Sequence, residues 1–325
     1  MLRISTAFFA LLLLFRGCSP ATTSSSTPAP KPSPLATGTP GSSPQLLAVY
    51  EPWFGHPQHI SVGYSSHDPN ELRKQIRKAK KMGITGFVVD WYGDRDPFNA
   101  RTYELLQPIA AEENFRIAMM YDETDSEDGA TDEALADFTN FRDEFLAPTA
   151  PGHEAYLTDA GRPVIFIFPK GGHTDWNRVR ESLNQWNPAP LLIYENLPGA
   201  NASAFDGFYA WVNPGKKGWA QDGSNWGEDY LADFYSTMRS KYPDKIPVGG
   251  AWAQFDDAKA SWSLNRHISA RCGQTWTDTM NFWRQYFPAD HPLPWMLIET
   301  WNDYEEGTAI EPGIPTCPGG SQQAR

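Results

Sequence analysis

Hydrophobic and polar positions follow two alternating periods along most of the chain. Short apolar runs rich in β-branched and aromatic residues are separated by amphipathic stretches with helical spacing. This alternation predicts a (β/α)8 TIM-type barrel. After the last run only a short tail rich in Pro and Gly remains, so we expect the barrel to lack a regular eighth helix. The apolar runs predict strands at Leu47–Trp53, Gly86–Trp91, Arg116–Tyr121, Pro163–Phe168, Pro190–Tyr194, Gly207–Trp211, Pro247–Ala251 and Trp295–Glu299.

The clearest helix start follows the first predicted strand. Asp68 is placed to cap the helix because its side chain can accept a hydrogen bond from a free backbone N–H group. Pro69 then occupies the first helical position, where its missing N–H group costs nothing. Leu72, Ile76 and Ala79 fall on one face of this helix, and we expect that face to point inward.

The N-terminus has the pattern of a signal peptide at residues 1–18. A positive charge at Arg3 precedes the apolar run Ala7–Phe15, which is too short to cross a bilayer. Gly17 and Cys18 resemble a bacterial lipoprotein cleavage site, which makes Cys18 a candidate lipid anchor and the only expected membrane contact. Residues 19–45 are mostly Ser, Thr, Pro, Ala and Gly and predict a disordered tether. One folded domain at 46–325 is therefore expected outside the cytoplasm, in the periplasm, anchored at the outer membrane, or extracellular.

Composition narrows the classes of partner. The chain has 325 residues, a net charge of −12 and a pI near 5.0, which argues against a nucleic-acid partner. No glycine-rich phosphate motif follows the first strand and no Cys-x-x-Cys occurs, so we expect neither a cofactor nor a metal. Cys272 and Cys317 can pair outside the cytoplasm. A tethered barrel of this kind is expected to be a monomer.

The ends of the predicted strands carry the candidate chemistry, since the active site of a TIM barrel lies at the C-terminal ends of its strands. Nearly every strand ends in an aromatic residue beside an acid or amide, which suits a neutral polyhydroxylated ligand such as an oligo- or polysaccharide. The alternative is that these aromatic residues only cap the core. The candidate sugar contacts are Trp53, Tyr64, Trp91, Tyr121, Glu195, Trp252 and Asn302.

Asp303 and Glu306 are the candidate catalytic pair. Cleavage of a glycosidic bond needs two carboxyl groups, and these two follow the last strand three residues apart. A turn would direct both into one pocket. An Asp-x-x-Glu pair is also common on solvated surfaces, but Trp301, Asn302 and Tyr304 beside this one make such a surface a weaker interpretation.

The segment Trp301–Pro312 resembles the signature of glycoside hydrolase family 99, the endo-α-mannosidases and their bacterial relatives. The segments Tyr50–Gly55, Gly63–Pro69 and Gly86–Gly93 are similar to other parts of that family. The resemblance implies a glycosidase in which Asp303 draws the proton from a sugar 2-hydroxyl and Glu306 acts as acid and then base.

The same segment departs from family 99 at one position. That family has Glu where this chain has Asp303, and Asn302-Asp303-Tyr304 is similar instead to family 71, the α-1,3-glucanases. This second resemblance implies an inverting route, in which one carboxylate activates water. Sugar, linkage and stereochemistry are therefore open.

Two other functions remain as alternatives. A surface glycan-binding lipoprotein without catalysis would keep the aromatic residues and tolerate loss of either carboxylate. A metal-dependent hydrolase would need histidines from several strand ends, whereas His56 and His59 share one loop.

Overall fold

The computed structural model describes residues 42–317, except 198 and 215–224. The predicted signal peptide, Cys18 and residues 19–41 of the predicted tether lie outside the described residues. Strand β1 begins at Gln45, the last residue assigned to that tether. Within the described ranges, no helix is long and apolar enough to cross a membrane.

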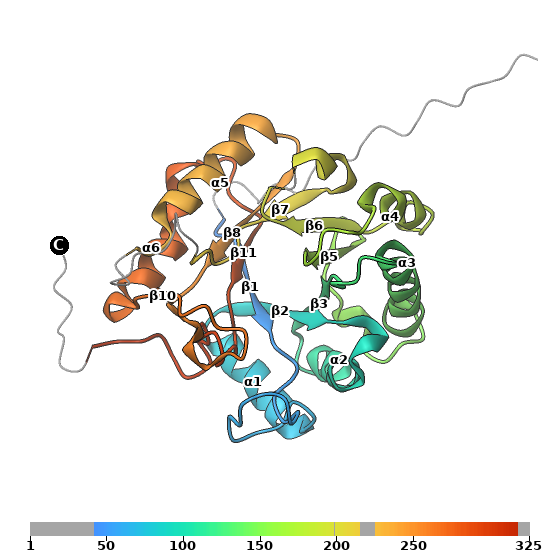
Figure 1. Ribbon diagram of the computed structural model, residues 1–325, viewed down its shortest axis with the longest axis horizontal. Coiled ribbons are helices and arrows are strands. Elements are labelled where there is room, and N and C mark those ends of the chain that lie inside the picture. The colour runs from blue at the N-terminus through green and yellow to red at the C-terminus, as the bar shows by residue number, and fades with distance from the viewer. Residues whose placement is uncertain (1–41, 198, 215–224, 318–325) are drawn as a thin grey trace, which may run out of the picture. The chain divides into compact units, whose positions relative to one another are not determined.

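Parallel strands close into a barrel in the order β3-β2-β1-β11-β8-β7-β6-β5 (Figure 1). Closure comes from β3 and β5, whose residues Met119 and Ile165 are paired in register. The predicted (β/α)8 class and the eight predicted strands are thereby confirmed, with boundaries shifted by a few residues. The barrel strands are β1 (Gln45–Tyr50), β2 (Ile84–Trp91), β3 (Arg116–Asp122), β5 (Arg162–Phe168), β6 (Leu191–Glu195), β7 (Gly207–Tyr209), β8 (Ile246–Ala251) and β11 (Trp295–Ile298).

Helices surround the barrel on its outer side (Figure 1). Asp68 caps the first one by accepting a hydrogen bond of 2.9 Å from the N–H group of Asn70, and Leu72, Ile76 and Ala79 are buried, as predicted. No helix follows β11 in residues 299–317, which agrees with the expected lack of an eighth helix. The helices are α1 (Pro69–Lys81), α2 (Pro97–Glu112), α3 (Ala130–Phe141), α4 (Trp176–Leu183), α5 (Glu228–Lys241) and α6 (Gln274–Phe282).

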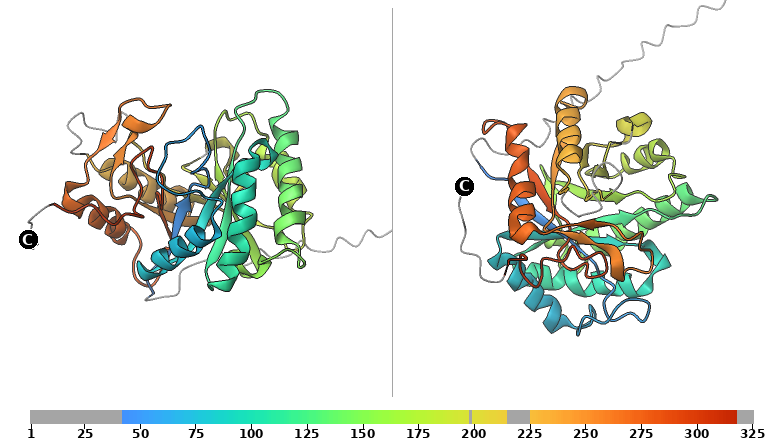
Figure 2. Two further views of the ribbon diagram at one scale, coloured as in Figure 1. Left: turned by 90° about the horizontal axis from the view of Figure 1, so that it is seen from below. Right: turned by 60° about the vertical axis from the view of Figure 1, so that its left-hand side comes forward.

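Short elements lie in the loops. Strand β4 (Thr158–Asp159) pairs antiparallel with the start of β5, and β9 (Phe255–Asp256) pairs antiparallel with β10 (His267–Ile268). The orange segment of β9 and β10 lies at the same end of the barrel as the blue loop after β1 (Figure 2). Those two loops are the walls of the cavity described below.

Successive residues of the barrel strands belong to two different cores. Leu47 and Val49 of β1 pack with alternate residues of the other strands, and this cluster includes no helix residue, so it fills the barrel interior. Ala48 and Tyr50 pack with the helices instead. This is the two-residue period of a strand, which sends neighbouring side chains to opposite faces.

A disulfide joins Cys272 to Cys317, with Cα atoms 4.8 Å apart. It ties the segment after β11 to the turn that precedes α6. The pairing that the sequence left open therefore exists in this structure, and it fixes the described end of a tail that has no helix of its own.

Candidate active site

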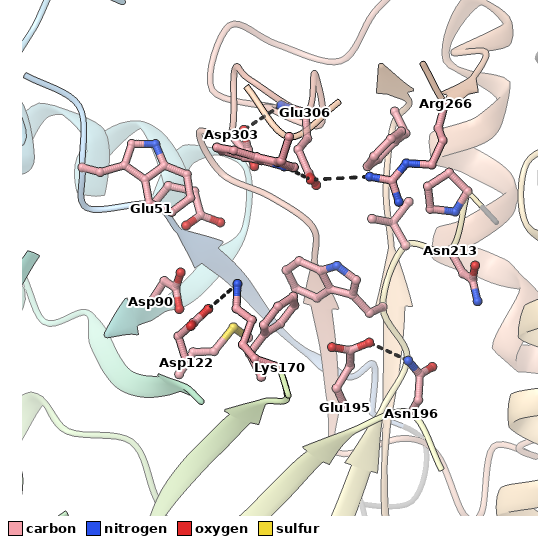
Figure 3. A pocket seen from close by; sticks show the side chains of 18 of the residues that line it. Glu51, Asp90, Asp122, Lys170, Glu195, Asn196, Asn213, Arg266, Asp303 and Glu306 are labelled. Carbon is pink, nitrogen blue, oxygen red and sulfur yellow. Dashed lines mark hydrogen bonds and ion pairs between the residues drawn. The ribbon is translucent and has the colours of Figure 1, made fainter. Parts of the chain in front are cut away.

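A cavity of about 510 Å³ opens at the C-terminal ends of the barrel strands (Figure 3). Six carboxyl groups line it, together with two cationic side chains and a set of aromatic rings. Four of the carboxyl groups come from the ends of β1, β2, β3 and β6, and two from the turn after β11. They belong to Glu51, Asp90, Asp122, Glu195, Asp303 and Glu306.

The turn after β11 holds Asp303 and Glu306 together. One carboxylate oxygen of Asp303 accepts hydrogen bonds of 2.8 Å from the N–H groups of both Glu305 and Glu306. The Asp303 N–H group donates to Thr300 Oγ1 at 2.7 Å. Gly307 follows with φ of 66°, a left-handed conformation that favours glycine. The short side chain of Asp303 thus organises the turn that presents Glu306.

Asn302 fastens this turn to the end of β1. Its Oδ1 accepts from the N–H group of Glu51 and its Nδ2 donates to the Glu51 carbonyl, both at 2.8 Å. The side chain of Asn302 is completely buried. Glu51 and Asp303 are therefore fixed relative to each other, although they lie far apart in the sequence.

Asp303 and Glu306 interact electrostatically. Burial, and next the charge of Glu306, raise the pKa of Asp303 to about 8, against the two backbone hydrogen bonds that lower it. Burial also raises the pKa of Glu306, while Trp262 and Arg266 lower it. Two neighbouring carboxyl groups of this kind favour a state in which only one of them is charged.

The loop between β9 and β10 contacts Glu306. Trp262 Nε1 donates to Glu306 Oε1 at 2.9 Å, and Arg266 lies 4.0 Å from the same oxygen. Asp257 shapes this loop: it accepts from the Leu264 and Arg266 N–H groups and pairs with the Arg266 guanidinium at 2.8 Å. Trp262 is 44% exposed, so its ring is available to a ligand at the mouth of the cavity.

Acidic residues at the ends of the first three strands form another wall of the cavity. Lys170 Nζ lies 3.2 Å from Asp122 Oδ2. Burial raises the pKa of Asp90 to about 6, although Lys170 lowers it. Burial and the charges of Asp90 and Asp303 hold the pKa of Glu51 well above its ordinary value. Among the described residues, Lys170 is therefore the only lysine in the lining beside the three carboxyl groups of Glu51, Asp90 and Asp122.

Two further glutamates lie at the ends of β6 and β11. Glu195 lines the cavity and accepts a hydrogen bond of 2.5 Å from Asn196 Nδ2, and burial raises its pKa to about 8. Glu299 is fully buried and does not line the cavity; it accepts from the Val212 N–H group. Burial raises the pKa of Glu299 well above its usual range.

The loop after β1 adds aromatic surface. The rings of Trp53 and His59 are stacked with centroids 4.7 Å apart, and both line the cavity. His59 Nδ1 lies 2.7 Å from Glu305 Oε2, and the N–H group of Ile60 in the same loop donates a hydrogen bond to Glu305 Oε1. Glu305, between the two candidate catalytic residues, therefore holds the loop instead of facing the cavity.

The structure brings together some of the residues predicted from the sequence and not others. Asp303, Glu306, Trp53 and Glu195 line the cavity, and Asn302 lies directly behind it. The four other candidates for sugar contact do not line it. Trp91 and Tyr121 face the helices, Trp252 donates its indole N–H group to the Trp226 carbonyl, and Tyr64 donates to Glu311.

Sequence reasoning did not select several residues that line the cavity. Glu51, Asp90 and Asp122 could have been found from the strand period, because each is in phase with interior residues of its strand. Lys170 follows β5 by two residues and obeys the same phase. Trp262 and Arg266 carry no such signal, since they come from a long loop. Among the described residues, no group of three or more His, Cys, Asp or Glu side chains could hold a metal ion.

Known structures with this fold include glycoside hydrolases. A family 99 endo-α-mannosidase from Bacteroides thetaiotaomicron, in complex with bis-tris-propane, is 19% identical, with a TM-score of 0.64 over 82% of this chain and 86% of that one. A glycoside hydrolase-like protein is 15% identical, with a TM-score of 0.63 over 86% and 89% of the two chains. No protein-family model and no curated protein matches the sequence. At these identities the likeness establishes a shared fold.

Proposed function

We propose that this chain is a glycoside hydrolase that cleaves an α-linked glycan with Asp303 and Glu306. One observation carries the proposal: both carboxyl groups lie on one turn at the C-terminal mouth of a barrel, in a cavity lined by acids and aromatic rings. The likeness to an endo-α-mannosidase of the same fold supports an α-mannan as the first substrate to try. The family 71 resemblance keeps α-1,3-glucan as the second.

Glycosidic cleavage requires a proton for the leaving oxygen and a second carboxylate near the anomeric centre. The buried pair meets this requirement because mutual repulsion favours one proton shared between Asp303 and Glu306. Exposed Trp262 offers a flat face on which a sugar ring can pack, and Trp53 adds a buried aromatic edge to the lining. The cavity volume of about 510 Å³ is within the range of sites for small ligands.

The roles within the pair are the finer part of the proposal. The family 99 resemblance assigns the base to Asp303 and the acid to Glu306. The electrostatics of the unliganded site point the other way, because Trp262 and Arg266 stabilise a charged Glu306 while Asp303 has a pKa near 8. A glycosidic oxygen that replaces Trp262 at Glu306 would remove one of these two donors. We therefore treat the pair as one unit that carries a single proton.

A binding protein without catalysis is the second candidate. The observation that favours it is the engagement of one Asp303 oxygen by two backbone N–H groups, a structural role that would persist without chemistry. Retention of Glu306 beside Trp262 in the cavity favours the enzyme.

Product analysis by proton NMR tests the proposal. The purified protein is incubated with yeast α-mannan, α-1,3-glucan and xylan, in parallel with Glu306→Gln and, as a matched control, Glu154→Gln. We expect the wild type to release oligosaccharide from an α-glycan and Glu306→Gln to lose at least 100-fold in rate, the order expected for an acid–base group. Glu154→Gln, at an exposed position that does not line the cavity, should retain most activity. Binding of a glycan without cleavage by any of the three proteins would favour the second candidate.

A further inference from the structure

We propose that the cavity binds a glycan unit that carries a positively charged amino group, and that Glu51 and Asp90 receive this ammonium. The inference rests on the proposed function and specifies its substrate class. It concerns the acidic side chains at the ends of β1 and β2, which face the cavity (Figure 3).

The first observation is an excess of acid over base around the cavity. Six carboxyl groups line it, against the cations Lys170 and Arg266. Both cations are already paired, Lys170 with Asp122 at 3.2 Å and Arg266 with Asp257 at 2.8 Å. Asp257 does not line the cavity, so part of the charge of Arg266 is directed away from it. Lys170 is the only cation of the described lining that acts on Asp90, and its ion pair is with Asp122, so three carboxyl groups of this wall share one lysine.

The second observation is that these two carboxyl groups are buried without full hydrogen bonding. Glu51 is 4% exposed and Asp90 6%. Glu51 Oε2 and Asp90 Oδ1 have no hydrogen-bond partner among the described residues. Buried carboxylate oxygens are ordinarily paired, because an unpaired one loses its hydration without compensation. Such groups at the wall of an open cavity indicate a ligand that supplies the donors.

An ammonium group fits these oxygens better than a hydroxyl group does. A hydroxyl donates one hydrogen bond and carries no charge, whereas an ammonium supplies three donors and a positive charge. The wall already accepts one such group, since the Lys170 ammonium lies at hydrogen-bonding distance from Asp122. Glu51 and Asp90 would hold a second one in the same manner.

Binding of an ammonium should release protons. Burial and the charges of Asp90 and Asp303 hold the pKa of Glu51 well above its ordinary value in the free protein. A bound cation favours the charged carboxylate and lowers that pKa. Proton release therefore separates recognition of a cation from recognition of a neutral sugar.

Matched sugars test the inference on the full protein. NMR titrations at pH 6 compare methyl α-D-mannoside with its 2-amino-2-deoxy analogue and the N-acetylated analogue, and the gluco and galacto series repeat the comparison. We expect the amino sugar of at least one series to bind tenfold or more tightly than both neutral forms, and calorimetry in two buffers to show proton release. Glu51→Gln and Asp90→Asn should each reduce this preference to threefold or less.

The control variant is Asp137→Asn, which removes a buried carboxyl that does not line the cavity. It should keep the preference for the amino sugar. Equal binding of amino and neutral sugars, no binding of any of them, or a preference that Glu51→Gln and Asp90→Asn leave intact would each overturn the inference. Cleavage of a neutral α-glycan in the assay of the previous section would then leave the glycosidase proposal standing, so the two failures are distinguishable.

Discussion

Replacing Asn302 with Ala tests the two hydrogen bonds that hold the turn of Asp303 and Glu306 to the end of β1. Asn302 is completely buried, and its amide makes both of its 2.8 Å hydrogen bonds to the backbone of Glu51. Truncation leaves the N–H and C=O groups of Glu51 without these partners in a buried position. Each unsatisfied buried group costs about 1–3 kcal/mol, so the free energy of unfolding should fall by about 3–4 kcal/mol.

The measurement is urea unfolding followed by tryptophan fluorescence, with wild type and variant compared at their midpoints. For a protein of this size the expected loss corresponds to a midpoint lowered by about 1 M or more. Asn281→Ala is the matched control, because the amide of Asn281 bonds one carbonyl of its own helix at an exposed position. Its effect should stay within about 0.5 kcal/mol.

The same variant should also impair function. Without these two hydrogen bonds the turn that carries Asp303 and Glu306 can move, and a displacement of about 1 Å can cost on the order of 100-fold in rate. A loss of stability below about 1 kcal/mol together with unchanged turnover would refute the reasoning that Asn302 positions the site.

Two further predictions concern stability. Replacing Cys272 and Cys317 with Ser should lower the free energy of unfolding by about 2–4 kcal/mol, because the disulfide closes a long loop across a sequence separation of 45 residues; equal unfolding midpoints for oxidised and reduced protein would contradict this. Burial raises the pKa of Glu195 to about 8, so the folded protein holds a proton that the unfolded chain releases near pH 4, and this group makes stability fall as pH rises from about 4 to 8. The difference in free energy of unfolding between Glu195→Gln and wild type should therefore favour the variant more at pH 8 than at pH 5. A difference that stays constant over this range would exclude the assigned shift.

The sequence alone determined the barrel and its local signals. Eight apolar runs of strand length separated by helical patterns allow few other folds, and the cap at Asp68 depends only on residues next to it. The proximity of Asp303 and Glu306 was predictable for the same reason, since a three-residue separation on a turn is a local property. Such features need no knowledge of which distant segments meet.

The sequence does not show as easily which side chains at the strand ends point into the cavity. Strands of a parallel barrel are buried on both faces, so their sequences are almost continuously apolar and the two-residue alternation is hidden. Trp91 and Tyr121 therefore seemed to be candidates for sugar contact, while Asp90 and Asp122, one residue out of phase with them, face the cavity. The phase becomes visible only when the interior cluster is known.

Only the tertiary structure decided which groups surround the turn that carries Asp303 and Glu306. Closure of the barrel brings Glu51 to Asn302 across 251 residues, and the loop between β9 and β10 carries Trp262 to Glu306 across 44 residues. Neither contact has a local pattern, because each depends on the register of strands far apart in the chain. The sequence supplied the two carboxyl groups, whereas the raised pKa of Asp303 and the other acidic residues around the cavity arise from burial that folding alone creates.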